Sequence, residues 1–214
     1  MVKIRELSTA EEITNAILHG IGLGLAIAAL VVLVVYANMY GNIWHIVTFT
    51  IYGSTLVILY LASTLYHSFP KGKAKNILKI IDHACVYLLI AGTYTPLTLI
   101  TLRGTLGWTI FGIVWGIALV GIIFKIFFIK KFIILSTLLY IGMGWLIIIA
   151  IKPLMAGLNG TSLRFLFVGG MFYTVGTIFY GMQRIKYNHA VWHLFVLAGS
   201  IYHFFTILFL LPNY

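Results

Sequence analysis

Long apolar runs alternate with short polar stretches along the whole chain. A helix needs roughly 20 apolar residues to cross the hydrocarbon core of a bilayer. Seven runs meet this length, at about 13–37, 43–67, 78–101, 105–124, 132–151, 163–183 and 189–211. Pro96 interrupts the third run, where a kink is tolerable because neighbouring helices can satisfy the freed carbonyl. The pattern predicts an all-α, polytopic membrane protein, a bundle of seven transmembrane helices.

The composition supports this class. Hydrophobic residues make up 62% of the 214 residues and charged residues only 8%, whereas about a quarter of the residues of a soluble domain are charged. No polar stretch is long enough to fold separately, so residues 1–214 are expected to form a single membrane domain. The single cysteine, Cys85, excludes an internal disulfide.

The basic residues predict the orientation. Cytoplasmic loops of membrane proteins carry an excess of Lys and Arg. Eleven of the 14 basic residues fall on the N-terminal side of the bundle: Lys3, Arg5, Lys71, Lys73, Lys75, Lys79, Lys125, Lys130, Lys131, Arg184 and Lys186. The other side has Arg103, Lys152 and Arg164. We therefore expect a cytoplasmic N-terminus and an outside C-terminus, with no nucleic-acid partner despite the net charge of +10, because the basic residues form no continuous patch.

One acidic residue lies inside a predicted span. Three of the four acids precede the first helix, whereas Asp82 lies a few residues inside the third. An ionisable group within a span is costly and indicates a functional site. The alternative is an interfacial carboxylate that pairs with Lys79, one turn away.

Histidines are the second signal. His67 closes the second run, and His189 and His193 open the seventh. A spacing of four places His189 and His193 on one helix face, a common arrangement for two zinc ligands. Ser63 precedes His67 by the same spacing, so its hydroxyl lies on the same face, one turn deeper.

The predicted topology brings these groups to one depth. The second run ends inside, and the third and seventh begin inside, so His67, Asp82, His189 and His193 are expected near the inner leaflet. Three histidines plus an open position is the arrangement of a catalytic zinc. Asp82 is then expected to hold a water or act as general base, and Ser63 to orient that water or Asp82. A metal-free alternative is a hydrogen-bonded histidine network that titrates near neutral pH.

Three other histidines are expected outside this cluster. His203 lies roughly 15 Å along the helix from His193, at 1.5 Å per residue, and cannot share its metal. We expect it to pack or hydrogen-bond in the outer half of the membrane. His45 is expected at the outer interface, and His83 points about 100° away from Asp82 around the helix.

The first run begins with three polar residues at helical spacing, Glu12, Asn15 and His19. They are expected either to form a second shell around the metal ligands or simply to cap the helix at the interface.

Taken together, these residues resemble the hemolysin III family, the bacterial branch of the progestin and adipoQ receptors, which include the adiponectin receptors. The resemblance covers about residues 11–207. Its motifs are Glu12-x-x-Asn15-x-x-x-His19-Gly20, Ser63-x-x-x-His67, Asp82 with Tyr87 and the Gly92–Pro96 stretch, and His189-x-x-x-His193-x-Phe195-Val196 with His203.

The resemblance implies a multi-pass protein of the bacterial plasma membrane with Zn2+ held by His67, His189 and His193. The wider superfamily includes alkaline ceramidases, which hydrolyse a lipid amide with a similar serine, aspartate and histidine set. Ser63 and Asp82 occupy the matching positions here. The first functional hypothesis is therefore a zinc-dependent intramembrane hydrolase of lipid amides or esters, with a membrane lipid or fatty acid as its partner.

The second hypothesis is non-catalytic. The name of the family reflects pore-forming or cytolytic activity, and related members are linked to membrane-lipid homeostasis. Zinc would then be structural and would tie the second and seventh helices together. Against a pore, the sequence has no polar stripe long enough to line a wide channel.

Overall fold

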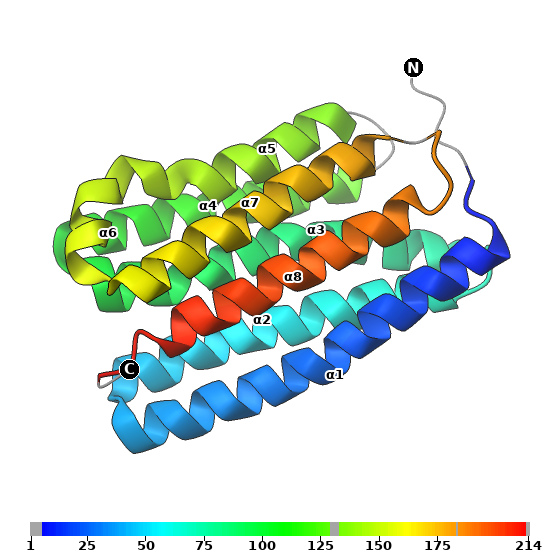
Figure 1. Ribbon diagram of the computed structural model, residues 1–214. Helices are drawn as coiled ribbons and strands as arrows, with labels where there is room; N and C mark the ends of the chain where they lie inside the picture. Colours follow the sequence, from blue (N-terminus) through cyan, green and yellow to red (C-terminus); the bar gives the residue numbers. More distant parts are fainter. Residues whose placement is uncertain (1–5, 129–132, 183, 213–214) are drawn as a thin grey trace.

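The computed structural model describes residues 6–128, 133–182 and 184–212, and helices account for nearly all of them (Figure 1). The helices run in the order α1 (Thr9–Tyr40), α2 (Ile43–Ser68), α3 (Lys73–Pro96), α4 (Gly104–Phe128), α5 (Ile133–Trp145), α6 (Ile151–Gly157), α7 (Gly160–Gly181) and α8 (Asn188–Leu208). A π-helical segment, Leu97–Leu102, extends α3, and a 3-10 segment, Leu146–Ala150, joins α5 to α6. These described residues contain no β-strand.

Seven helices within the described residues are long and apolar enough to cross a membrane, so the predicted all-α seven-span class is confirmed. The boundaries differ in places. The fifth span is composed of α5, the 3-10 segment and α6, and it runs to Gly157 rather than to residue 151. The last helix ends at Leu208 and continues as turns, and residue 183, the expected end of the sixth span, lies outside the described residues.

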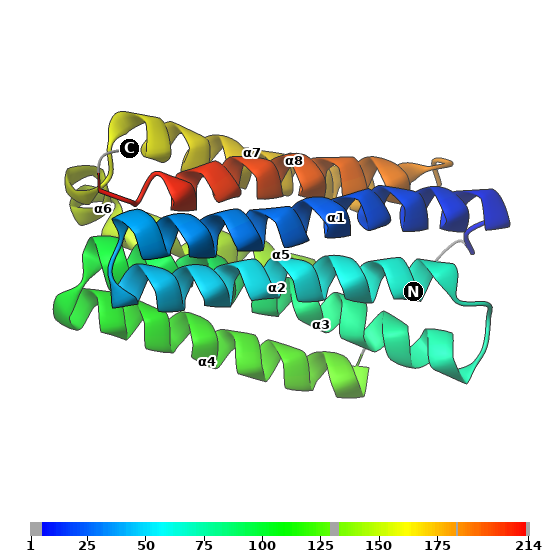
Figure 2. The same ribbon diagram turned by 90° about the horizontal axis from the view of Figure 1, so that it is seen from below.

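Successive spans run antiparallel, and α3 lies in the middle (Figures 1 and 2). Helices α1 to α4 pack in sequence order, α7 packs on α8, and α8 also packs on α1. Close approach of α2 and α3 depends on Gly92, because a Cβ at this position would overlap the side chain of Thr55. This arrangement brings the end of α2 and the starts of α1, α3 and α8 to the same end of the bundle.

We call this end, which carries His67, His189 and His193, the histidine end. Its described basic residues are Lys71, Lys73, Lys75, Lys79, Lys125, Arg184 and Lys186, and the opposite end carries Arg103, Lys152 and Arg164. Lys3, Arg5, Lys130 and Lys131 lie outside the described residues. Among the described residues, most basic side chains thus lie at the histidine end and few at the opposite end, as the predicted orientation requires. That the histidine end faces the cytoplasm stays a prediction.

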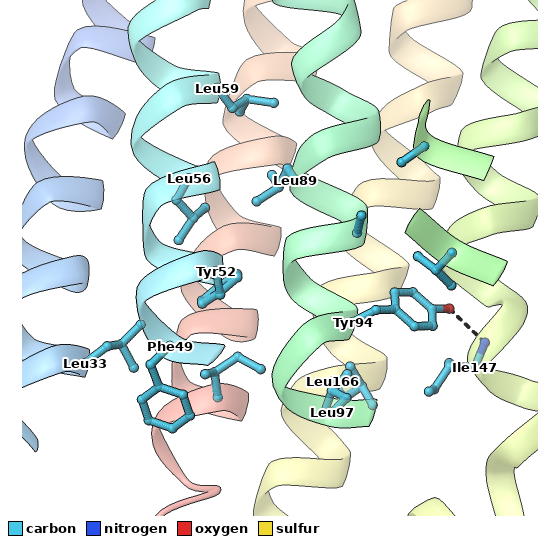
Figure 3. Packing of buried hydrophobic residues seen from close by; sticks show 14 of the residues in the cluster. Leu33, Phe49, Tyr52, Leu56, Leu59, Leu89, Tyr94, Leu97, Ile147 and Leu166 are labelled. Carbon is cyan, nitrogen blue, oxygen red and sulfur yellow. Dashed lines mark hydrogen bonds between the residues drawn. The ribbon is translucent and has the colours of Figure 1, made fainter. Parts of the chain in front are cut away.

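Tyr94 explains why the fifth span is not a continuous α-helix. The backbone N–H of Ile147 donates to the Tyr94 hydroxyl at 2.8 Å (Figure 3). That hydroxyl lies 2.9 Å from the carbonyl oxygens of Met143 and Gly144, to which it can donate. Backbone groups inside a membrane must find partners within the protein, so this side chain of α3 stabilises the break between α5 and α6.

Candidate metal centre

Three histidines from two helices meet at the histidine end. His67 lies in the last turn of α2, and His189 and His193 lie in the first two turns of α8. Each offers one ring nitrogen, and these three atoms lie within 4.8 Å of one another. The ring centroids of His189 and His193 are 4.5 Å apart, and both lie about 5 Å from that of His67 (5.1 and 5.0 Å). The predicted convergence of these residues is therefore present.

Glu12 orients the ring of His67. Its Oε2 lies 2.6 Å from His67 Nδ1. A carboxylate can only accept, so Nδ1 carries the proton and Nε2 keeps a free lone pair. Lys75 balances the charge, with its Nζ 3.0 Å from Glu12 Oε1. A carboxylate that fixes the tautomer of a ligand histidine is the usual second-shell contact of a metal site.

Each of the three rings has a nitrogen without a hydrogen-bond partner among the described residues. Nε2 of His67, Nε2 of His189 and Nδ1 of His193 are buried and have no hydrogen-bond partner among the described residues. Most buried polar atoms in proteins are hydrogen-bonded, so an exception on each of three clustered rings indicates that an additional group binds there. Three imidazole nitrogens form the ligand set of a catalytic zinc with one open position. The residues present therefore fit a zinc ion.

Helix α1 supplies the second layer of the cluster. The ring of His19 stacks on that of His193, with 3.5 Å between centroids and an interplanar angle of 17°. Asn15 is fully buried, one turn before His19. The expected second shell thus includes Glu12 and His19 in direct contact with two of the three histidines. The structure gives no contact of the Asn15 side chain with the histidines.

Asp82 and Ser63 line the same cavity as His189 and His193. The Ser63 hydroxyl is buried and has no hydrogen-bond partner among the described residues, so it is available to a ligand. Asp82 Oδ2 lies 3.3 Å from Nδ1 of His83. The expectation that His83 points away from Asp82 is therefore wrong. Adjacent residues diverge by about 100° on a helix, but the His83 side chain is long enough to turn back.

Glu11 is a residue of this region that the sequence reasoning missed. Its Oε2 accepts from the backbone N–H and the hydroxyl of Ser8, at 3.0 and 2.9 Å. Its Oε1 accepts from the backbone N–H of Tyr187 at 2.8 Å. Tyr187 precedes α8 in the left-handed conformation, with φ 59°. Glu11 thus fixes the start of the helix that carries His189 and His193. The spacing of Ser8 and Glu11 is that of a capping box, so the sequence could have predicted the contact between these two residues. It gave no indication of the contact between Glu11 and Tyr187.

An elongated apolar cavity extends from the histidines toward the opposite end. It has about 170 Å³ of space for water-sized molecules, and α2, α3, α5, α7 and α8 all contribute to its walls. Leu59, Leu89, Leu97 and Leu166 belong to this lining, and Figure 3 shows them along the interior faces of their helices. The cavity reaches His203, roughly 15 Å from His193 at 1.5 Å per residue.

The contact between Glu12 and His67 yields a prediction. Glu12→Gln keeps the size of the side chain but removes its charge, so His67 loses the partner that fixes its tautomer. We expect zinc affinity to fall about 10- to 100-fold, as measured by competition with a chromophoric chelator. The matched control is Glu6→Gln, because Glu6 is 82% exposed and pairs with Lys71 at the surface. Equal affinities for Glu12→Gln and wild type would contradict the role of Glu12.

The other two histidines lie near the opposite end of the bundle. His203 is buried, and its Nε2 lies 3.2 Å from the carbonyl oxygen of Leu166, which confirms its expected hydrogen-bonding role. His45 is more enclosed than an interfacial residue, because it is only 2% exposed and its Nε2 lies 3.3 Å from the carbonyl oxygen of Leu210. Neither joins the cluster of His67, His189 and His193.

Comparison with known proteins agrees with this architecture. Residues 7–204 match the family described as "Haemolysin-III related". The chain is 58% identical to "Hemolysin-3 homolog" of Bacillus subtilis (strain 168) over 199 residues, 93% of each chain. It is 54% identical to "Hemolysin-3" of Bacillus cereus over 199 residues, 93% of this chain and 91% of that one. "Monocyte to macrophage differentiation factor" of Homo sapiens is 27% identical over 170 residues, 77% of this chain and 70% of that one. The chain therefore belongs to the haemolysin-III related family and is a multi-pass integral membrane protein.

Proposed function

We propose that this protein is a zinc-dependent intramembrane hydrolase that cleaves an amide or ester bond of a lipid. The observation that supports this proposal most directly is the position of the three histidines. One nitrogen from each ring lies close to the other two, and His189 and His193 line one end of an elongated apolar cavity together with Asp82 and Ser63. A site for a metal, a carboxylate, a hydroxyl and a channel for a hydrocarbon chain are thus adjacent.

Each residue has a role in this proposal. His67, His189 and His193 hold the zinc ion, which supplies Lewis-acid chemistry by polarising a carbonyl oxygen and making water more acidic. Asp82 accepts a proton from the attacking water and returns it to the leaving nitrogen or oxygen as the carbonyl–heteroatom bond breaks. The products are a fatty acid and an amine or alcohol. The Ser63 hydroxyl donates a hydrogen bond to the substrate oxygen or to the water.

The surroundings support a lipid substrate. The cavity walls are mainly aliphatic and aromatic, so they favour an acyl chain and exclude bulk water from the chain-binding region. His83 Nδ1 lies 2.8 Å from the carbonyl oxygen of Lys79, and this contact holds the ring beside the Asp82 carboxylate, 3.3 Å away. We place the protein in a bacterial plasma membrane, because its Bacillus relatives cover more than nine-tenths of the chain.

The test is release of fatty acid by purified protein in lipid nanodiscs. Zinc-loaded protein is incubated with a panel of ceramides, phospholipids and acylglycerols, and free fatty acid is measured by mass spectrometry. We expect release from at least one class, loss of that release on treatment with a zinc chelator, and recovery when zinc is restored. No release from any lipid of the panel by the zinc-loaded protein would contradict the hydrolase.

A second candidate function is membrane lysis with a structural zinc, which the printed names of the two Bacillus relatives favour. In that case the zinc would only tie α2 to α8. Leakage of dye from liposomes, unchanged after His189→Ala and His193→Ala and without any release of fatty acid, would favour this alternative. The apolar lining of the cavity argues against a water-filled pore in this conformation.

A further inference from the structure

A second group of polar side chains lies deeper in the bundle than the three histidines, and it begins at Tyr60, whose ring centroid is 5.0 Å from that of His19. We call it the distal cluster, and it consists of Tyr60, Tyr173, Ser200 and His203. The Tyr60 hydroxyl donates to Ser200 Oγ at 2.9 Å, and the Tyr173 hydroxyl lies 2.8 Å from the same oxygen. The ring centroids of Tyr173 and His203 are 5.3 Å apart. Tyr173 and His203 line the cavity directly.

Two glycines allow α7 and α8 to approach closely here. A Cβ at Gly169 of α7 would overlap Cδ2 of His203, and a Cβ at Gly199 of α8 would lie 2.9 Å from the ring of Tyr173. The His203 ring therefore packs directly against the backbone of α7, and the Tyr173 ring against the backbone of α8. The cluster is built into the helix packing, because any larger residue at either glycine would displace a ring.

The hydrogen bond of His203 defines what the cluster can bind. Its Nε2 lies 3.2 Å from the carbonyl oxygen of Leu166, which can only accept, so Nε2 carries the proton. In the neutral ring, Nδ1 is then an acceptor with a free lone pair. Nδ1 is buried and has no hydrogen-bond partner among the described residues. It also lies on the opposite edge of the ring from Cδ2, which faces Gly169, so it is turned away from α7.

His203 Nδ1 is a buried acceptor without a partner in the described part of the chain, so a ligand that binds beside it should carry a hydrogen-bond donor. A hydroxyl is the uncharged donor that a hydrocarbon chain most simply carries, whereas a ketone or a plain methylene cannot donate. Between His203 and His193 the lining includes Val196 of α8 together with Tyr173 and Thr177 of α7, and the cavity walls as a whole are mainly apolar. The chain between the two polar ends is therefore expected to be mainly hydrocarbon.

We propose that the distal cluster is a subsite for a hydroxyl group in the middle of a lipid acyl chain. The inference rests on the proposed function to the extent that the cavity has to bind such a chain. His193 and His203 are roughly 15 Å apart along α8. An extended chain covers about 1.2 Å per bond, so the hydroxyl falls about twelve bonds from the carboxyl carbon. The protein is thus selective for mid-chain hydroxylated acyl chains.

The experiment compares the binding of four fatty acids to the zinc-loaded protein in nanodiscs by isothermal calorimetry. They are stearic, 12-hydroxystearic, 12-oxostearic and 3-hydroxystearic acid. We expect 12-hydroxystearic acid to bind about three- to tenfold more tightly than the other three, the gain of one buried hydrogen bond. The 12-oxo acid tests whether the bound group has to donate a hydrogen bond. The 3-hydroxy acid tests whether the hydroxyl has to lie at the depth of His203.

Two variants locate the effect. His203→Phe keeps an aromatic ring but removes the acceptor, and we expect it to bind 12-hydroxystearic and stearic acid equally. The matched control is Tyr202→Phe on the same helix, since the Tyr202 ring packs against Phe165 and Phe172 rather than lining the cavity. It should keep the preference. If His203→Phe does not fold, the comparison of the hydroxy and oxo acids in wild type still decides.

Four outcomes would overturn the subsite. Equal affinities for the four acids, or a preference that survives His203→Phe, would refute it and leave the proposed hydrolase intact. Binding of none of the acids would refute it together with the proposal that the cavity holds acyl chains. Tighter binding of the 12-oxo acid than of the 12-hydroxy acid would show that the cluster donates instead of accepting.

Discussion

Asp82→Asn is expected to leave the zinc in place and to reduce fatty acid release at least about 100-fold, because general-base catalysis typically contributes 10²- to 10⁴-fold. The amide is nearly the same size as the carboxylate but does not accept a proton at neutral pH. Asp82 does not contribute to the cluster of three histidine nitrogens, so the metal ligands remain. The measurement is the initial rate of release from the preferred lipid, normalised to bound zinc.

The control for this variant is Glu6→Gln, the same change at an exposed carboxylate. It should hydrolyse at the wild-type rate. A zinc-loaded Asp82→Asn protein with full activity would show that another group accepts the proton. Loss of zinc from this variant would instead show that the carboxylate helps to hold the ion.

The depth of the site in the membrane was predictable, because the thickness of the bilayer determines the position of each helix along the membrane normal. Apolar runs of about 20 residues specify where a span begins and ends, so His67, Asp82 and His189 could be placed at one level before any contact was known. The membrane does not restrict rotation of a helix about its own axis in the same way. The contact between Glu12 and His67 follows from that rotation, and from sequence it was one of two alternatives.

Contacts made by flexible side chains or across long sequence separations were not predictable. His83 was set aside on helical geometry, yet its ring reaches Asp82. Glu11 contacts Tyr187, and no periodicity relates two positions so far apart. The break in the fifth span requires the Tyr94 hydroxyl beside Ile147, a contact between two helices. The cavity depends on the packing of several helices at once, which one sequence does not specify.

His67→Ala and His189→Ala are each expected to remove the zinc. Each change deletes one of three ligands, and the two remaining imidazoles offer too few donors for a protein zinc site, which usually has three or four protein ligands. Metal binding also stabilises the folded state through linkage. Both variants should therefore show no increase in melting temperature when zinc is added, whereas the wild type should. His45→Ala is the matched control, because His45 is as buried as His67 but lies at the opposite end of the bundle.

The most direct test is the zinc content of the four purified proteins, measured by elemental analysis after loading with zinc and removal of free metal. Wild type and His45→Ala should contain about one zinc per chain, and His67→Ala and His189→Ala close to none. A wild-type protein that contains no zinc after loading, or His67→Ala and His189→Ala proteins that retain the full wild-type content, would contradict a metal centre formed by α2 and α8.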